Sequence, residues 1–215
     1  MTNGWKLDDA GQELLAIADQ IAVELVRPAA ERLDKEALFP QETIDAMRSR
    51  GLLRLVSSPD VGGHGQGLRT AVAVCERLAR ECASTAMVVK MHYCGTAVIE
   101  QHGNDELRRS IAEAGQLTTL AFSEYGSRSH FWIPVSTAER TAGGIALNAS
   151  KQLITSAGRA DIYIWSSRPV EADGLSTIWA VPADADGFTI PAPYDGLGLR
   201  GNSSAPIKAH NVLVP

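Results

Sequence analysis

Two stretches of this chain end in hydroxyl-bearing residues that could act together on a ligand. The first reads LTTLAFSEYGSRSH over residues 117–130, an apolar β-type segment that runs into a cluster of polar residues and glycine containing Ser123 and Ser129. The second reads ASKQLITS over residues 149–156 and carries Thr155. β-branched and aromatic residues bounded by Gly and Ser are typical of strands and their ends. We expect both strand ends to present hydroxyls toward one place, which outlines a binding site.

A purely structural interpretation of the same residues exists. Ser and Thr at strand ends often satisfy the backbone of a turn and bind nothing else. Glu124 is open to the same interpretation, since its carboxylate could orient the turn by accepting backbone N–H groups. We therefore assign it no role as a catalytic base, and the sequence offers no other catalytic residue.

The composition is that of an ordinary globular protein. The chain has 215 residues, 45% of them hydrophobic and 21% charged, which is enough for one large core or two modest ones. The formal net charge is -5, and Lys and Arg are dispersed along the chain, which disfavours nucleic-acid binding. The cysteines Cys75, Cys82 and Cys94 match neither a zinc site nor a disulfide scaffold, so we expect reduced thiols and no metal.

Targeting signals are also missing from the sequence. No window approaches the roughly 20 consecutive apolar residues of a membrane-spanning helix. The N-terminal residues lack the apolar core and cleavage site of a signal peptide. We expect a cytoplasmic protein with no membrane span.

Helical periodicity dominates the first half of the chain. Apolar residues recur every three to four positions from Gln12 to Arg32, with Pro28 expected to kink or end that helix. Shorter helices are predicted after Pro40, over residues 69–81, over residues 86–101 with Ser84 as a candidate cap, and after a cap at Asn104.

After Gly115 the period of the apolar residues changes to two. We predict strands over residues 117–122, 145–147, 153–155, 161–166, 176–181, 188–190 and 205–213. This order indicates an α+β fold, with an all-helical N-terminal domain over residues 1–116 and an antiparallel β-barrel-like middle domain over residues 117–215, which we expect to be incomplete at its C-terminal end.

Several motifs in order resemble the acyl-CoA dehydrogenase family. AFSEYGSRSH (residues 121–130) resembles the family signature Leu-Thr-Glu-Pro-x-Ala-Gly-Ser-Asp, and KQLITS (residues 151–156) resembles Lys-x-Trp-Ile-Thr-Asn. GLRGNSS (residues 198–204), with the final Val-Pro, resembles its Gly-x-Arg-x-Ser-x-Thr block, and the helix end HGND (residues 102–105) resembles a family helix junction. The resemblance covers nearly the whole chain and implies that family's fold, a helical domain followed by a β domain.

The resemblance also implies an FAD site. Ser123 and the backbone around Leu120 and Phe122 would contact the flavin ring, and Thr155 would donate its hydroxyl toward flavin N5. Ser129 would contact either the flavin or the pantetheine-phosphate part of a CoA thioester. Short hydroxyl side chains on rigid strand ends suit a reduced flavin, which needs donors near N5 and N1.

Four positions depart from the family pattern. Leu153 stands where the family has a tryptophan beside the flavin. We therefore expect Leu153 to contact the flavin too, but without an aromatic ring. Tyr125 replaces a proline, and Arg128 and His130 replace the Gly and Asp of the signature. These changes put the usual straight-chain substrate in doubt.

The resemblance also implies that an acyl chain would lie along the helix predicted over residues 86–101 of this sequence. Met91 and Cys94 are the residues of its apolar face that we expect to contact the chain, since methionine adapts to irregular cavities. Plain helix packing is the alternative. Lys90, His92 and Tyr93 on the same helix hint at a short or polar acyl group.

By resemblance, the function is α,β-dehydrogenation of an acyl-CoA thioester, with hydride transfer to flavin N5 and electrons passed to an electron-accepting flavoprotein. The glutamate base of the family lies in a C-terminal helical domain that this sequence does not include, so the chain would be a fragment or a truncated homologue. A homodimer or homotetramer is expected. The alternatives are a flavin-dependent monooxygenase on the same scaffold and a non-catalytic module that binds flavin or an acyl thioester.

Overall fold

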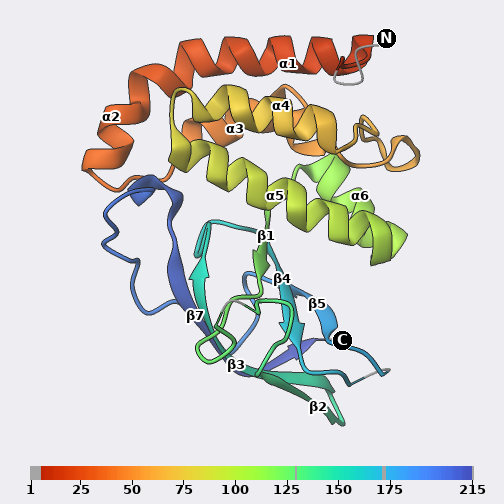
Figure 1. The fold of residues 1–215 in the computed structure, drawn as a ribbon. Helices are drawn as coiled ribbons and strands as arrows, with labels where there is room; N and C mark the ends of the chain where they lie inside the picture. The colour runs from red at the N-terminus through yellow and green to blue at the C-terminus, as the bar shows by residue number, and fades with distance from the viewer. Residues whose placement is uncertain (1–5, 129, 171–172, 215) are drawn as a thin grey trace. The chain divides into compact units, whose positions relative to one another are not determined.

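The computed structural model describes residues 6–128, 130–170 and 173–214. The chain forms two compact units, one containing the residues up to Gln116 together with Gly196–Asn202, the other Leu117–Asp195 together with the residues from Ser203 onward. The first unit is helical and the second holds the strands (Figure 1). The α+β prediction, with helices before strands, is therefore confirmed.

The helical unit is built from six α-helices and short 3₁₀ turns within the described residues. They are α1 (Asp9–Ile21), α2 (Arg27–Lys35), α3 (Gln41–Ser49), α4 (Leu68–Ala79), α5 (Ala83–His102) and α6 (Asp105–Ala114), with 3₁₀ turns at Leu52–Arg54, Pro59–Val61 and Arg200–Asn202. Helices α4 and α5 lie side by side in Figure 1. α5 is buried on several sides, as its apolar sequence predicts.

The helical run is irregular in the turn just before Pro28. A π-helical segment, Ala22–Val26, joins α1 to α2, and the helical run continues past Pro28, which lies in the first turn of α2. A proline within a helical run removes one backbone hydrogen bond and crowds the carbonyl one turn earlier, which here belongs to the π-helical segment. The predicted irregularity at Pro28 is therefore present, and the helical run does not end there.

Helix ends follow local sequence signals with one exception. Asn104 caps α6 by accepting a hydrogen bond from the Leu107 N–H at 2.9 Å, as predicted. Ser84 does not cap α5, because that helix begins at Ala83 after Cys82. The Ser84 hydroxyl instead accepts from the Gly201 N–H at 3.2 Å, a contact with a distant segment.

The β unit contains two open sheets in the described part of the chain. The strands are β1 (Thr118–Ala121), β2 (Thr137–Thr141), β3 (Gly144–Ile154), β4 (Ile162–Ser167), β5 (Thr177–Pro182), β6 (Phe188–Thr189) and β7 (Ala205–Val214). One sheet has the order β1-β4-β5 and the other β2-β3-β7-β6. Their shared core includes the buried side chains of Tyr163, Trp165, Leu147 and Ile207.

Two details of the predicted β architecture are corrected by this topology. The sheets do not close on themselves, so the unit is not a barrel, and β1 pairs with β4 in parallel while the other strand pairs are antiparallel. The strands predicted over residues 145–147 and 153–155 are the two ends of one long strand, β3, whose pairing with β7 is interrupted by two register shifts. Strand β2 was not predicted.

Residues 196–202 pack with the helices although both flanking segments belong to the β unit. The Arg200 guanidinium donates from Nε to the backbone carbonyl of Asp34 at 3.0 Å, and the Gly201 N–H donates to Ser84. The segment includes GLRGN (residues 198–202), the first part of the GLRGNSS motif. That part of the motif therefore packs against the helices.

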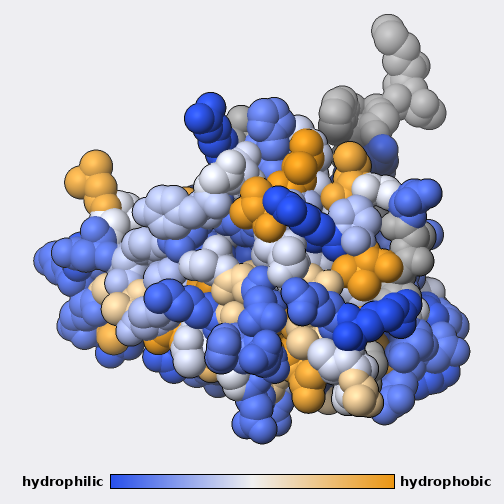
Figure 2. All heavy atoms as spheres, turned by 90° about the horizontal axis from the view of Figure 1, so that it is seen from below, coloured by the Kyte–Doolittle hydropathy of each residue, from blue (hydrophilic) through white to orange (hydrophobic). Residues whose placement is uncertain are grey.

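Figure 2 shows one face of the molecule, on which apolar side chains lie singly or in small groups among polar ones. Scattered apolar residues are normal on a folded surface. Of the helices described, none combines the length and apolar character that crossing a membrane requires.

Candidate functional site

The ends of β1 and β3 meet through backbone and side-chain contacts. The Gln152 N–H donates to the Ser123 carbonyl at 2.8 Å, and Glu124 forms an isolated antiparallel bridge with Lys151. The Thr119 hydroxyl in β1 donates to the Thr155 carbonyl at 2.8 Å. The two predicted strand ends therefore lie side by side, each tied to the other by a hydrogen bond.

The two hydroxyls differ in their surroundings. Thr155 is buried, at 6% exposure, and its own hydroxyl has no hydrogen-bond partner in the described part of the chain. Ser123 is half-buried. Ser129 lies outside the described residues. A contact of any of these residues with flavin remains a prediction.

Leu153 projects outward from a bulge. It has φ +55° and lies between the register positions of Lys151 and Ile154, where the pairing of β3 with β7 shifts. Its side chain is 65% exposed. Leu120 and Phe122 are half-buried at the end of β1. The exposed Leu153 occupies the same strand end as Thr155, two residues away.

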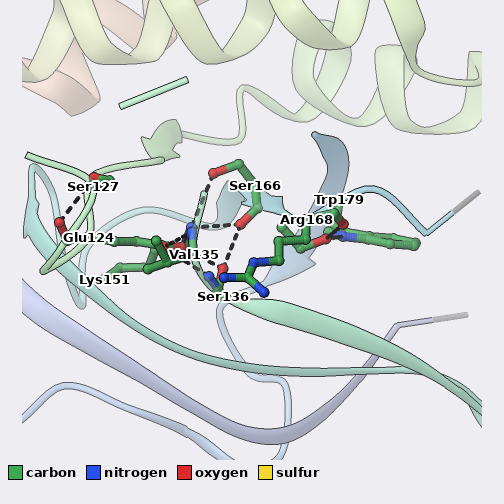
Figure 3. A network of polar contacts seen from close by, with 9 residues as sticks. Glu124, Ser127, Val135, Ser136, Lys151, Ser166, Arg168 and Trp179 are labelled. Carbon is green, nitrogen blue, oxygen red and sulfur yellow. Dashed lines mark hydrogen bonds and ion pairs between the residues drawn. The ribbon is translucent and has the colours of Figure 1, made fainter. Parts of the chain in front are cut away.

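A buried ion pair lies next to the two strand ends. The side chains of Glu124 and Lys151 point toward each other in Figure 3, and Lys151 Nζ donates to Glu124 Oε1. The exposed fractions of the two side chains are 0% for Lys151 and 1% for Glu124. Burying two charges is costly unless each is well hydrogen-bonded.

Both members of the pair have further partners. Glu124 Oε2 accepts from the backbone N–H groups of Val135 at 2.6 Å and Ser136 at 3.0 Å, and Oε1 accepts from the Ser136 hydroxyl at 2.5 Å. Lys151 Nζ donates to the Ser166 carbonyl at 2.6 Å and lies 5.1 Å from the centre of the Trp165 ring. The charges are thus satisfied within the protein.

The environment shifts both pKa values downward. Burial acts to raise the pKa of Glu124, but hydrogen bonds from Lys151 and Ser136 outweigh it, and the pKa lies below its usual value. Burial lowers the pKa of Lys151 to about 8, against the opposing effect of Glu124. The carboxylate is therefore ionised near neutral pH and acts as a hydrogen-bond acceptor, as its role in orienting the turn requires.

Part of this arrangement was predictable from the sequence. Acceptance of backbone N–H groups by Glu124 was one of the weighed interpretations, and the contacts with Val135 and Ser136 confirm it. The partnership with Lys151 was missed. A signal was present, because each residue is the charged member of a β-type stretch with mainly apolar or hydroxyl neighbours.

A second residue missed by sequence reasoning adjoins the same strand end. The Tyr194 hydroxyl donates to the side-chain carbonyl of Gln152, and the Tyr194 N–H donates to the Ser204 carbonyl at 3.0 Å. Tyr194 is 37% exposed. Gln152 thus contacts Ser123 through its backbone and Tyr194 through its side chain.

The predicted acyl-contacting residues lie on one face of α5. Met91 and Cys94 are half-buried, as are Met87 and Val98 one turn away on either side, so this apolar face is partly open within the helical unit. His92 and Tyr93 do not line that face, which corrects the hint drawn from them. Both are buried and bind backbone carbonyls, His92 that of Leu53 at 2.7 Å and Tyr93 that of Leu52 at 2.9 Å.

A surface pocket of about 430 Å³ lies elsewhere on the helical unit, between α1 and α4. Its charged side chains pair with one another or with nearby residues, Arg77 with Asp19 and Arg80 with Glu76. It offers no unpaired charge to a ligand and lacks Met91 and Cys94. Among the described residues, no three His, Cys, Asp or Glu side chains come together to hold a metal ion.

Known proteins match the chain over nearly its full length. Residues 8–114 match the acyl-CoA dehydrogenase N-terminal domain and residues 119–212 match the acyl-CoA dehydrogenase middle domain. The short-chain specific acyl-CoA dehydrogenase of Homo sapiens is 27% identical over 98% of this chain and 53% of its own length. The 3-sulfinopropanoyl-CoA desulfinase of Paraburkholderia xenovorans is 26% identical over 98% of this chain and 56% of its own. The chain spans about half the length of these curated relatives.

Solved structures share the fold. Butyryl-CoA dehydrogenase from Megasphaera elsdenii superposes with a TM-score of 0.87 at 23% identity, covering 98% of this chain and 58% of that one. A structure described as PigA with FAD and proline superposes with a TM-score of 0.84 at 19% identity, covering 98% and 57%. Both domain models, in the order in which they match, show that the chain belongs to the acyl-CoA dehydrogenase family.

Proposed function

We propose that this chain forms the helical and middle parts of an FAD-dependent oxidoreductase that introduces a double bond between the α and β carbons of an acyl-CoA thioester. The observation that carries the proposal is the junction of the two strand ends, where Gln152 binds the Ser123 carbonyl and Thr119 binds the Thr155 carbonyl. Because the chain belongs to the acyl-CoA dehydrogenase family, we interpret that junction as part of a flavin site.

The residues at the junction fit a flavin. The Thr155 hydroxyl is held on a rigid strand end and has no partner among the described residues, so it is free to donate to a ring nitrogen. Ser123 supplies a second hydroxyl one hydrogen bond away from Gln152. Leu120, Phe122 and the exposed Leu153 would supply apolar contacts to the ring. When bound, FAD would supply two-electron oxidation.

The names of two relatives support the substrate class. The human relative is named for short-chain acyl-CoA, and the relative from Paraburkholderia for 3-sulfinopropanoyl-CoA. The partly open face of α5, with Met91 and Cys94, would contact the acyl group, and Ser129 the pantetheine-phosphate part. An electron-accepting flavoprotein as partner, a homodimer or homotetramer, and a cytoplasmic location belong to the same proposal, as does the domain boundary between residues 116 and 117.

Flavin binding tests the proposal directly. Purified protein is titrated with FAD, and binding is followed by the quenching of flavin fluorescence. We expect the wild-type protein to bind FAD and Thr155→Val to weaken binding about tenfold, because the valine keeps the shape of threonine and loses the donor. Thr189→Val, at an exposed position in β6, is the matched control. A wild-type protein that binds no FAD would contradict the proposal.

Acyl-CoA thioesters of different chain lengths, added without oxygen to the flavin-loaded protein, test the substrate class. Binding next to the ring would shift the visible absorption band of the flavin, and reduction would bleach it. A band that no thioester changes would refute the substrate class and leave flavin binding standing.

A further inference from the structure

The Glu124 carboxylate closes the loop that follows it. The side chain of Glu124 accepts hydrogen bonds from the backbone of Val135 and Ser136, eleven and twelve residues further along the chain. One carboxylate thus holds together the start and the end of the loop over residues 125–134. That loop carries the residues at which the signature departs from the family, Tyr125, Arg128 and His130.

Lys151 connects this closure to the sheets. It lies in β3, donates to Glu124 in the loop closure, and donates to both the carbonyl and the hydroxyl of Ser166 in β4, at 2.6 and 3.1 Å. Ser136 also reaches the Ser166 carbonyl, at 3.1 Å. A single buried ammonium group therefore fixes three segments of the chain to one another (Figure 3).

Stability alone does not account for a pair in this position. An apolar pair of similar volume often stabilises a core as well as a buried ion pair does, because charges lose their hydration on burial. Unlike apolar contacts, the hydrogen bonds of the ion pair are directional, so they fix the positions of the bonded segments relative to one another. Glu124 lies one residue after Ser123, and Lys151 lies four residues before Thr155.

We propose that Lys151 is a positioning residue, which acts through Glu124 to hold the Ser123 turn and the loop over residues 125–134 in register with the strand end at Thr155. The inference rests on the proposed flavin site, because the register matters for function only if both strand ends contact the same ligand. Lys151 itself is fully buried, and its ammonium group donates to Glu124 and Ser166.

The experiment compares Lys151→Met with Val181→Ala in the full chain. Methionine keeps the length of the lysine and removes its charge. Val181 is a buried core residue in β5 that stands opposite Tyr163 in β4, so its truncation is expected to lower the melting temperature without removing any hydrogen bond of the pair. Each variant is measured for melting temperature, FAD affinity, the shape of the bound-flavin absorption band, and hydrogen exchange of residues 123–136 and 152–156.

We expect Lys151→Met to weaken FAD binding at least tenfold, to change the flavin band, and to speed exchange in both segments. Val181→Ala should leave affinity within about twofold and show no exchange change confined to those segments. Equal effects of the two variants on affinity and exchange would overturn the positioning role. If Lys151→Met does not fold, the double variant Glu124→Gln/Lys151→Met replaces it, since removing both charges leaves no unpaired buried ion.

The exchange measurement separates this inference from the function on which it rests. Faster exchange in the two segments of Lys151→Met, in a protein whose wild type binds no FAD, supports the positioning role and counts against the flavin site. Unchanged exchange in Lys151→Met, in a protein whose wild type binds FAD, counts against the positioning role and leaves the flavin site standing.

Discussion

The Thr119 hydroxyl donates to the Thr155 carbonyl at 2.8 Å, so that a buried side chain of β1 binds the backbone just after the end of β3. Strand β1 pairs through its backbone with β4 and not with β3. This side-chain bond adds to the backbone contacts of Gln152 with Ser123 and of Lys151 with Glu124, and it can be removed without disturbing the pairing of β1 with β4 or of β3 with β7.

Thr119→Val tests this link. The valine fills the same volume and leaves the buried Thr155 carbonyl without that donor, which we expect to lower the free energy of unfolding by about 1–3 kcal/mol. Urea unfolding of the purified protein measures the loss. Thr189→Val, at an exposed position, should change the unfolding free energy by less than about 0.5 kcal/mol. A Thr119 variant as stable as the wild type would show that the bond contributes nothing net.

Gly201 tests the attachment of residues 196–202 to the helical unit. A Cβ on Gly201 would lie 2.8 Å from the Leu38 carbonyl oxygen, which is backbone and cannot move aside cheaply. We expect Gly201→Ala to cost about 1–3 kcal/mol in unfolding free energy through overpacking. Gly198→Ala in the same segment meets no atom within 4 Å and serves as the control. Equal stability of the two variants would mean that Gly201 is not packed against the Leu38 carbonyl.

Local signals in the sequence predicted local features correctly. The Asn104 cap depends on the backbone N–H of Leu107, three residues further along in the same turn, so it needs no tertiary information. The order of helices and strands follows from periodicity, and the adjacency of the Ser123 and Thr155 stretches was expected from the polar residues at the two strand ends.

Features that depend on distant partners were missed or misplaced. The sequence of β1 alternates in the same way whether its partner runs parallel or antiparallel, and its pairing with β4 spans more than 40 residues. Strand β2 is an edge strand with almost every side chain exposed, so it carries no apolar alternation to detect. The bulges of β3 break its period and made one strand resemble two. The Lys151 partnership arises only once β3 lies beside the Glu124 turn.

Glu81 predicts how the helical unit responds to acid. Hydrogen bonds from the Arg27 guanidinium, and then from Arg77, lower the pKa of Glu81 to about 2 against the opposing effect of burial. A folded-state pKa below the unfolded value means that the stabilisation is complete above about pH 4.5 and is lost as the pH falls toward 2. Glu81→Gln should be less stable than the wild type at about pH 6, with a difference that shrinks on acidification. Urea unfolding at several pH values measures this, and a gap independent of pH would contradict it.

Cys75 should react slowly with thiol reagents despite being only half-buried. Burial raises the pKa of its thiol to about 11, so the thiolate fraction at pH 8 is about a hundredfold smaller than that of a thiol of pKa 9. In a variant with Cys82 and Cys94 changed to serine, we expect the labelling rate to rise about tenfold per pH unit up to pH 10. Fast labelling at neutral pH, independent of pH, would show that Cys75 is an activated thiol.

Tyr163 predicts the response of the β unit to alkali. Its hydroxyl oxygen accepts from the Gly158 N–H at 2.7 Å, and burial raises the pKa of the phenol from 10.0 to about 12. Because the folded state holds the proton more tightly than the unfolded state, this stabilisation is complete below about pH 10 and is lost as the pH rises through 12. A shift of this size corresponds to roughly 2–3 kcal/mol between those limits.

Tyr163→Phe isolates the effect of that hydroxyl. The variant should be less stable than the wild type near pH 8, since the Gly158 N–H loses its acceptor, and the difference should shrink between about pH 10 and 12 as the wild type alone must ionise a buried phenol. Unfolding monitored by circular dichroism across this range gives the difference at each pH. Tyr125→Phe, which removes a hydroxyl from a side chain that is 80% exposed, is the matched control. Parallel stability curves for the wild type and Tyr163→Phe would mean that the buried phenol does not couple its proton to folding.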